Sequence, residues 1–246
     1  MSAQAQPSVS LLSQTWSLFL KALPALLIAL IALDLTPAVD LPLSRLFYRP
    51  GAGFFLDHNW LVQLLYLGTP WLMRVLAVGL LGILAWVTLA KPPQARRIRN
   101  ATIFALLALV IGPGLIANSV LKDHWGRPRP EQITEFGGKS TFVPALWPSR
   151  QCAHNCSFVS GHAAAGFFLI TGAWIWPKRR LAWRIGGIAA GTLIGLARIA
   201  QGGHFFSDVL GALIVVWFTN EMLYYWMLSR GWLEPPPKKK PAQRKA

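Results

Sequence analysis

The residues with reactive or charged side chains gather in short polar segments beside long apolar runs. These segments are Lys122-Asp-His-Trp-Gly-Arg127-Pro-Arg129-Pro130, then Val159-Ser160-Gly161-His162, and finally Arg198 to Asp208 with His204 between them. Lys122, Arg129 and Arg198 suit a phosphate dianion, which arginine binds through two parallel hydrogen bonds. His162 and His204 can supply a nucleophile and a proton donor. This combination of residue types indicates phosphoryl chemistry.

The third segment predicts a paired imidazole and carboxylate. His204 and Asp208 are four residues apart, a spacing that places two side chains on one face of a helix. The carboxylate can then hold one ring nitrogen and leave the other free to react. Gly202 and Gly203 favour a helix break just before this pair. We therefore predict that Arg198 ends one helix and that His204 and Asp208 open the next.

Ser160 and the backbone N–H groups of Gly161 and His162 are predicted to begin a helix, where unpaired donors attract an anion. Other interpretations use the same residues. A hydrolase triad of Ser160, His204 and Asp208 leaves the cations unexplained. A zinc site of His162, His204 and Asp208 would place a metal ion among cations that repel it. A lipid or ion transporter is a third alternative, although transporters typically bind their cargo at mid-membrane between internal repeats.

The composition is typical of a membrane protein: 54% of the 246 residues are hydrophobic and 13% are charged. A spanning helix needs about 20 mostly apolar residues, and its backbone must hydrogen-bond internally. The candidate spans are Ala22–Leu33, Trp71–Ala90, Ala101–Leu121, Ala163–Trp176, Ile185–Ala197 and Val209–Met227. We predict an all-α fold: a six-span helical bundle at 16–230, preceded by a polar segment at 1–15 that is not a cleaved signal and followed by a basic, disordered tail at 231–246.

The net charge of +15 would favour nucleic-acid binding in a soluble protein. Here the lysines and arginines instead concentrate at 91–99, 178–184 and 230–245, after every second apolar run. Loops rich in Lys and Arg stay in the cytoplasm. The pattern therefore predicts no nucleic-acid partner, two cytoplasmic termini, and polar segments that face the periplasm from a bacterial inner membrane.

Four further features lie outside the reactive segments. Cys152 and Cys156 occupy a predicted outer loop, where they are compatible with a disulfide and with two free thiols. The fifth run carries small residues at every fourth position, Gly187, Gly191 and Gly195, which lets helices approach closely. Residues 39–69 mix aromatic residues with proline and glycine, which favours an outer loop and an interfacial helix or an irregular connector. Arg74, near the outer end of the second run, is predicted to reach the lipid headgroups.

The three reactive segments together resemble the type 2 phosphatidic acid phosphatase (PAP2) family. The resemblance rests on Lys-x6-Arg-Pro, Ser-Gly-His and Arg-x5-His-x3-Asp, in that order, and covers roughly residues 100–215. Membrane members of this family are six-span lipid phosphatases that need no metal, so the resemblance implies no cofactor. The family usually has Pro in place of Val159 and Ser in place of Ala197, and neither change removes a reacting group.

The resemblance also implies a role for each motif residue. His204 would attack phosphorus and form a phosphohistidine, Asp208 would orient it, and His162 would protonate the leaving group. The residues implied to hold the phosphoryl oxygens are Lys122, Arg129, Ser160, Gly161 and Arg198. Arg127 is a second Arg-Pro beside the motif, and the six-residue gap from Lys122 selects Arg129 instead.

The implied partner is a phosphorylated membrane lipid, either lipid A, undecaprenyl diphosphate, phosphatidylglycerol phosphate or phosphatidate. The segments Phe136-Gly-Gly and Cys156-Ser-Phe-Val-Ser-Gly-His162 are similar to bacterial envelope-lipid phosphatases, which favours lipid A or the polyprenyl carrier. We expect the loop Glu131–Asn155 to select among these lipids. A phosphotransferase, with a lipid hydroxyl in place of water, is the alternative enzyme.

Overall fold

The computed structural model describes residues 11–233. The first residues of the predicted polar segment and nearly all of the predicted disordered tail lie outside this range. The described chain is mostly helical, which confirms the all-α class apart from one small hairpin.

The N-terminal part forms a bent pair of helices and then a hairpin. Helices α1 (Leu11–Asp34) and α2 (Pro37–Arg45) meet at a bend of 50°, because Pro37 lacks the N–H group that would continue the first helix. Strands β1 (Tyr48–Arg49) and β2 (Gly53–Phe54) pair antiparallel. Positive φ angles occur at Gly51, in the turn between the strands, and at Gly53, the first residue of β2.

Helix α3 (Trp60–Ala90) begins earlier than its apolar run predicts. The Asn59 side chain accepts hydrogen bonds from the backbone N–H groups of Leu61 and Val62, at 3.0 and 3.4 Å, and so caps the helix. The prediction of a separate interfacial helix before Trp71 is therefore wrong for residues 60–69, because they form the first turns of the same helix.

The next helix is continuous from Ala95 to His124 and changes its winding partway. It consists of α4 (Ala95–Leu109), the π-helical segment η1 (Val110–Leu121) and α5 (Lys122–His124). The wide turn surrounds Pro113, which removes one backbone donor. The side-chain amide of Asn118 donates to the Pro113 carbonyl at 2.7 Å, so a polar side chain ties Asn118 to the proline within this segment.

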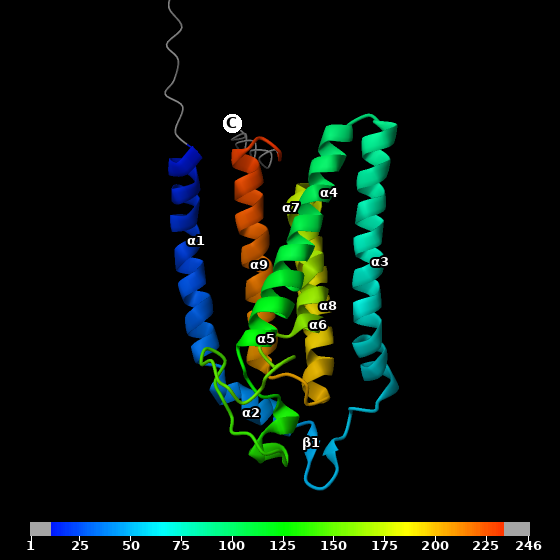
Figure 1. Cartoon of the computed structure of the whole chain (residues 1–246). Helices are drawn as coiled ribbons and strands as arrows, with labels where there is room; N and C mark the ends of the chain where they lie inside the picture. Colours follow the sequence, from blue (N-terminus) through cyan, green and yellow to red (C-terminus); the bar gives the residue numbers. More distant parts are fainter. Residues whose placement is uncertain (1–10, 234–246) are drawn as a thin grey trace, which may run out of the picture.

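A long loop with two short 3-10 turns, η2 (Pro130–Gln132) and η3 (Thr134–Phe136), leads to the C-terminal helices. These helices are α6 (Gly161–Phe167), the 3-10 turn η4 (Phe168–Thr171), α7 (Gly172–Ile175), the 3-10 turn η5 (Pro177–Arg179), α8 (Arg180–Ala200) and α9 (Phe206–Ser229). In Figure 1 the long helices run side by side. The hairpin, α2 and the long loop gather at one end, and the α3–α4 connection lies at the other.

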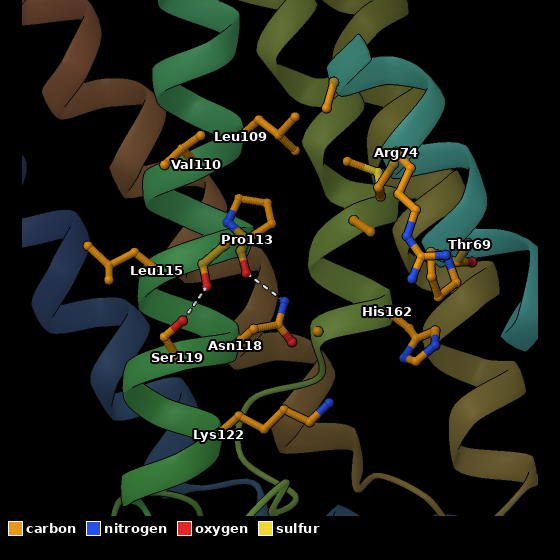
Figure 2. Close-up of a pocket in the computed structure, with 16 residues that line it drawn as sticks. Thr69, Arg74, Leu109, Val110, Pro113, Leu115, Asn118, Ser119, Lys122 and His162 are labelled. Carbon is orange, nitrogen blue, oxygen red and sulfur yellow. Dashed lines mark hydrogen bonds between the residues drawn. The ribbon is translucent and has the colours of Figure 1, made fainter.

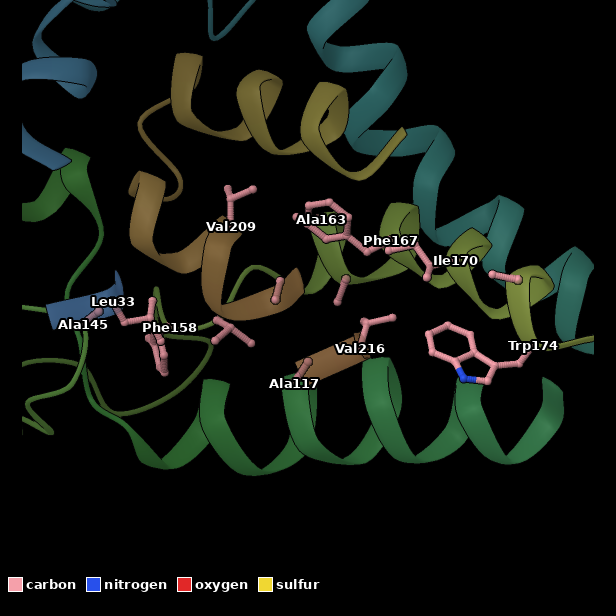
Figure 3. Close-up of a cluster of buried hydrophobic side chains, with 14 of the residues drawn as sticks. Leu33, Ala117, Ala145, Phe158, Ala163, Phe167, Ile170, Trp174, Val209 and Val216 are labelled. Atoms are coloured by element: carbon pink, nitrogen blue, oxygen red, sulfur yellow. The ribbon is translucent and has the colours of Figure 1, made fainter. Parts of the chain in front are cut away.

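The core lies where α6, α8 and α9 meet, and Figure 3 shows its buried side chains. The close helix approach predicted from the glycine pattern is confirmed. A Cβ atom on Gly187 would lie 2.5 Å from the backbone of Ile170, and one on Gly191 would lie 2.1 Å from the Phe167 ring. A Cβ atom on Gly195 would lie 2.4 Å from Val209.

The structure does not confirm the count of six spans. Within residues 11–233, α3, the helix Ala95–His124 and α9 are long and apolar enough to cross a membrane, and the bent pair of α1 and α2 gives a fourth if it is one span. The segment Gly161–Ile175 is apolar but shorter. Helix α8 has 21 residues, but arginines near both ends and several glycines make it less apolar.

Candidate active site

The three reactive segments meet at the end of the bundle that carries the long loop. The first ends the helix Ala95–His124, the second opens α6, and the third joins α8 to α9. This end also holds α2 and the hairpin (Figure 1). All eight residues of the predicted site lie in these segments: Lys122, Arg129, Ser160, Gly161, His162, Arg198, His204 and Asp208.

His204 and Asp208 are paired, although not on one helix. Helix α9 begins at Phe206, so His204 lies in the loop before it, and the prediction that His204 opens the helix is wrong. Nδ1 of His204 is 3.5 Å from Oδ2 of Asp208, a close contact whose geometry is too poor for a hydrogen bond. Within residues 11–233 no group hydrogen-bonds to Nε2 of His204, which is therefore free to react.

Several donors fix the carboxylate of Asp208. The backbone N–H of Phe205 donates to Oδ2 at 2.7 Å, and the Ser157 hydroxyl donates to the same oxygen at 2.5 Å. Arg127 donates to Oδ1 at 2.5 Å. Because these donors come from separate parts of the chain, Asp208 has little freedom to turn away from His204.

Arg127 links Asp208 to a second buried carboxylate, Asp40 in α2. Its guanidinium donates to Oδ2 of Asp40 at 2.9 Å and to the Ser207 hydroxyl at 2.6 Å, and its Nε donates to the carbonyl of Val143 at 2.7 Å. Arg127 and both carboxylates are fully buried. The six-residue gap from Lys122 had favoured Arg129 over Arg127, and no motif contains Asp40. The sequence features that could have indicated this pair were an acidic residue and a second Arg-Pro, both at the edges of apolar runs.

Arg198 lies on the aromatic ring of Tyr66, with 4.4 Å between the guanidinium carbon and the ring centroid. It donates to the side-chain carbonyl of Gln201. A Cβ atom on Gly203 would lie 2.2 Å from the guanidinium, so a larger residue there would displace Arg198 from this position. Gly202 has a φ of 69°, and the predicted break between Arg198 and His204 is confirmed.

Lys122 and Arg129 form the basic wall contributed by the first segment. Both Arg129 and Arg198 are close enough to Lys122 to interact with it electrostatically. The Arg129 guanidinium donates to the carbonyl of Asn155, at 2.8 Å from Nη2. Asn155 lies in the small loop closed by a disulfide between Cys152 and Cys156. This loop therefore holds Arg129 in place.

Ser160, Gly161 and His162 begin α6. The Ser160 hydroxyl accepts from the backbone N–H of Ala163 at 3.3 Å and caps the helix. A Cβ atom on Gly161 would lie 2.1 Å from the Asn118 side chain, so glycine permits close packing against η1. The His162 ring lies 5.0 Å from the ring of Tyr66, centroid to centroid, and within the described chain its Nε2 has no hydrogen-bond partner.

The electrostatics keep His204 neutral before a substrate binds. Burial lowers its pKa to about 3. The Asp208 carboxylate acts in the opposite direction, and the positive charges of Arg198 and Lys122 add to the effect of burial. A neutral imidazole with a free nitrogen next to cations can attack a bound phosphoryl group.

Comparison with known proteins places the chain in a family. The model of the PAP2 superfamily matches residues 101–232, more than half of the chain. The chain belongs to the PAP2 superfamily. The matched region contains all three reactive segments. Among residues 11–233, no cluster of three or more His, Cys, Asp or Glu side chains is placed to hold a metal ion.

The chain is also similar to curated bacterial phosphatases. It is 44% identical over 134 residues to the lipid A 4'-phosphatase of Francisella tularensis subsp. novicida, which is 54% of this chain and 60% of the relative. It is 42% identical over 117 residues to that of Rhizobium etli, covering 47% and 45%. Phosphatidylglycerophosphatase B of Bacillus subtilis is 30% identical over 115 residues, covering 43% and 49%. The matches thus span 60% or less of each of these relatives. No solved structure matches.

Proposed function

We propose that this protein is an integral membrane phosphatase that removes a phosphate group from a lipid. The observation that carries the proposal is the environment of His204. One ring nitrogen faces Asp208, the other has no partner in the described chain, and Lys122 and Arg198 lie close enough to act on it. Membership of the PAP2 superfamily and the names of the relatives support the same reaction.

In the proposed reaction Nε2 of His204 bonds to phosphorus as the bond to the lipid oxygen breaks, which leaves a phosphohistidine. His162 gives a proton to the departing lipid oxygen, and Asp208 stabilises the positive charge on His204. A water oxygen then bonds to phosphorus as the bond to Nε2 of His204 breaks, His162 takes a proton from that water, and inorganic phosphate leaves. The phosphoryl oxygens are held by Lys122, Arg129, Ser160, Gly161 and Arg198.

The substrate we propose is a phosphorylated glycolipid of the lipid A type. The support is that relatives at 44% and 42% identity are named lipid A 4'-phosphatases, whereas the phosphatidylglycerophosphatase is at 30%. The alternative substrates are a polyprenyl diphosphate, phosphatidylglycerol phosphate and phosphatidate. Assaying the protein against each of these lipids would distinguish them. Release of inorganic phosphate into water would separate the hydrolase from a phosphotransferase and from a transporter.

We further propose six membrane crossings in a bacterial inner membrane, with the site on the periplasmic face and both termini in the cytoplasm. The crossings would be α1, α3, the helix Ala95–His124, α6 to α7, α8 and α9. The support is the side-by-side arrangement in Figure 1 and the basic clusters at 91–99 and 178–184, which lie at the end away from the site.

The experiment that tests the mechanism measures phosphate release by the purified full-length protein. His204→Ala is expected to lower turnover at least about a thousandfold, because covalent catalysis is lost. His58→Ala is the matched control, since His58 is exposed and is not part of the site. Wild-type rates in a folded His204→Ala protein would refute the assignment of His204 as the nucleophile.

Two further measurements address the intermediate and the metal. A quenched reaction with labelled phosphate should leave an acid-labile, base-stable label on the wild type and none on His204→Ala. Vanadate should inhibit, because it adopts the five-coordinate geometry of the reacting phosphoryl group. Loss of activity in a chelator, restored by zinc, would favour the zinc interpretation instead.

A further inference from the structure

A pocket of about 700 Å³ extends from the candidate site into the membrane-embedded part of the protein. It lies between α3 and η1, and Figure 2 shows its lining residues. Lys122 and His162 line the end nearest the site, so the pocket and the candidate site share residues. Farther along, the lining is apolar and includes Met73, Ala77 and Val110. An acyl chain fits such a lining.

One charged residue in this pocket has no place in the proposed reaction. Arg74 lies in α3, eight residues beyond Tyr66, which packs on His162. At about 1.5 Å of rise per residue, its backbone is about 12 Å farther from the site along the helix. Its side chain extends back along the helix, and the guanidinium stacks on Trp71 at 4.8 Å. Figure 2 shows this side chain on the same side of the pocket as Thr69 and His162.

No acidic residue compensates the Arg74 charge. In the described part of the chain it forms no ion pair with a carboxylate, and neither Asp nor Glu lines the pocket. An arginine within a spanning helix is costly unless it reaches water or a partner. The pocket thus offers an unpaired cation between an apolar groove and a phosphate site. Its charge matches an anion carried by the molecule that occupies the groove.

We propose that Arg74 binds a second phosphate of the lipid substrate, one that is not removed. The inference rests on the proposed function, because the scissile phosphate must occupy the candidate site while the acyl chains lie between α3 and η1. A planar guanidinium can bind two phosphate oxygens at once. Arg74 therefore favours lipids with two phosphates over lipids with one. The second phosphate can come from a bisphosphorylated glycolipid or from the inner phosphate of a diphosphate lipid.

The test compares kcat/KM for substrate pairs that differ by one phosphate, using full-length protein in detergent. The pairs are lipid A bisphosphate with lipid A 4'-monophosphate, and a polyprenyl diphosphate with its monophosphate. In Arg74→Met, the preference for the two-phosphate member of one pair should fall about tenfold or more. The pair that loses its preference identifies the source of the second phosphate. Arg74→Lys should lose less, because it keeps the charge.

Arg184→Met is the matched control. Arg184 also stacks on a tryptophan, Trp217 at 4.9 Å, but it lies in α8 and does not line the pocket. Its substrate preference should equal that of the wild type. If Arg74→Met lowered kcat/KM equally for both members of each pair, Arg74 would be a membrane anchor. That result would overturn the second-phosphate site and leave the proposed function standing. A wild type that hydrolyses none of these lipids would overturn the proposed function, and the subsite with it.

Discussion

At the scale of single residues, Arg127 and Arg129 belong to the same short segment and have different surroundings. Arg129 is only half-buried and donates to the Asn155 carbonyl, so part of its guanidinium is accessible to a substrate phosphate. Arg127 is fully buried between Asp208 and Asp40 and has no access to one. We infer that Arg127 is a positioning residue that acts on the reaction through Asp208.

Replacing Arg127 by methionine should damage stability and turnover together. The change leaves Asp40 and Asp208 as buried carboxylates without their cation, which costs about 3–5 kcal/mol when one partner of a buried pair is removed. Thermal unfolding in detergent measures the loss. The double variant Arg127→Met/Asp40→Asn should recover part of the stability, because one buried charge is gone.

A kinetic readout separates positioning from simple loss of fold. For the folded fraction of Arg127→Lys, kcat should fall about tenfold or more while KM changes little, because Asp208 loses its orientation and the phosphate keeps its cations. Lys122→Met should instead raise KM. If Arg127→Lys raised KM as much as Lys122→Met does, Arg127 would be a phosphate ligand.

The buried imidazole of His204 also makes stability depend on pH. Burial lowers its pKa to about 3, whereas the unfolded chain binds this proton near the ordinary value of 6.5. Keeping the buried His204 neutral therefore costs no stability above pH 6.5. As the pH falls from 6.5 toward 3, the free energy of unfolding decreases by up to about 1.4 kcal/mol per pH unit, because only the unfolded chain binds the proton. Thermal unfolding at pH 7 and pH 5 should show a smaller decrease for His204→Gln than for the wild type. Equal decreases would mean that His204 is not neutral in the folded protein.

At the scale of elements, glycines in α8 set how closely the helices behind the site can pack. Gly191 contacts the Phe167 ring, and a Cβ atom there would clash at 2.1 Å, whereas Gly186 in the same helix has nothing within 4 Å. Gly191→Ala should destabilise the protein by about 1–3 kcal/mol through overpacking. Gly186→Ala should be neutral or stabilising by up to about 1 kcal/mol, because alanine favours a helix. The two unfolding temperatures measure the difference, and equal values would contradict the packing.

The same elements show what the sequence could predict. The break at Gly202 and the close packing along Gly187, Gly191 and Gly195 were predictable, because glycine has a local conformational and steric meaning. The pairing of Arg127 with Asp40 was not, because 87 residues separate the partners and only the folded chain brings them together. The start of α3 was missed for a third reason. Gly68 and Pro70 divide its apolar run, yet the helix continues through them.

At the scale of the whole molecule, the two ends of the bundle differ in what they present. One end carries the candidate site, covered by the hairpin and by the long loop, whose side chains Ile133 and Phe136 pack against Phe205 from the connection between α8 and α9. The other end carries basic residues between α3 and α4 and before α8. If the site faces the periplasm, a lipid can reach it sideways through the groove between α3 and η1 without leaving the bilayer.

This orientation is tested by placing single cysteines at the two ends. The native Cys152 and Cys156 are joined in a disulfide and are not available to a maleimide. Lys139 and Arg179 are both exposed, the first in the long loop and the second just before α8. Lys139→Cys should be labelled by a membrane-impermeant maleimide on intact spheroplasts, because we place it in the periplasm. Arg179→Cys should be labelled only after permeabilisation. The reverse pattern would put the site in the cytoplasm, and labelling of both positions on intact spheroplasts would contradict their placement on opposite faces.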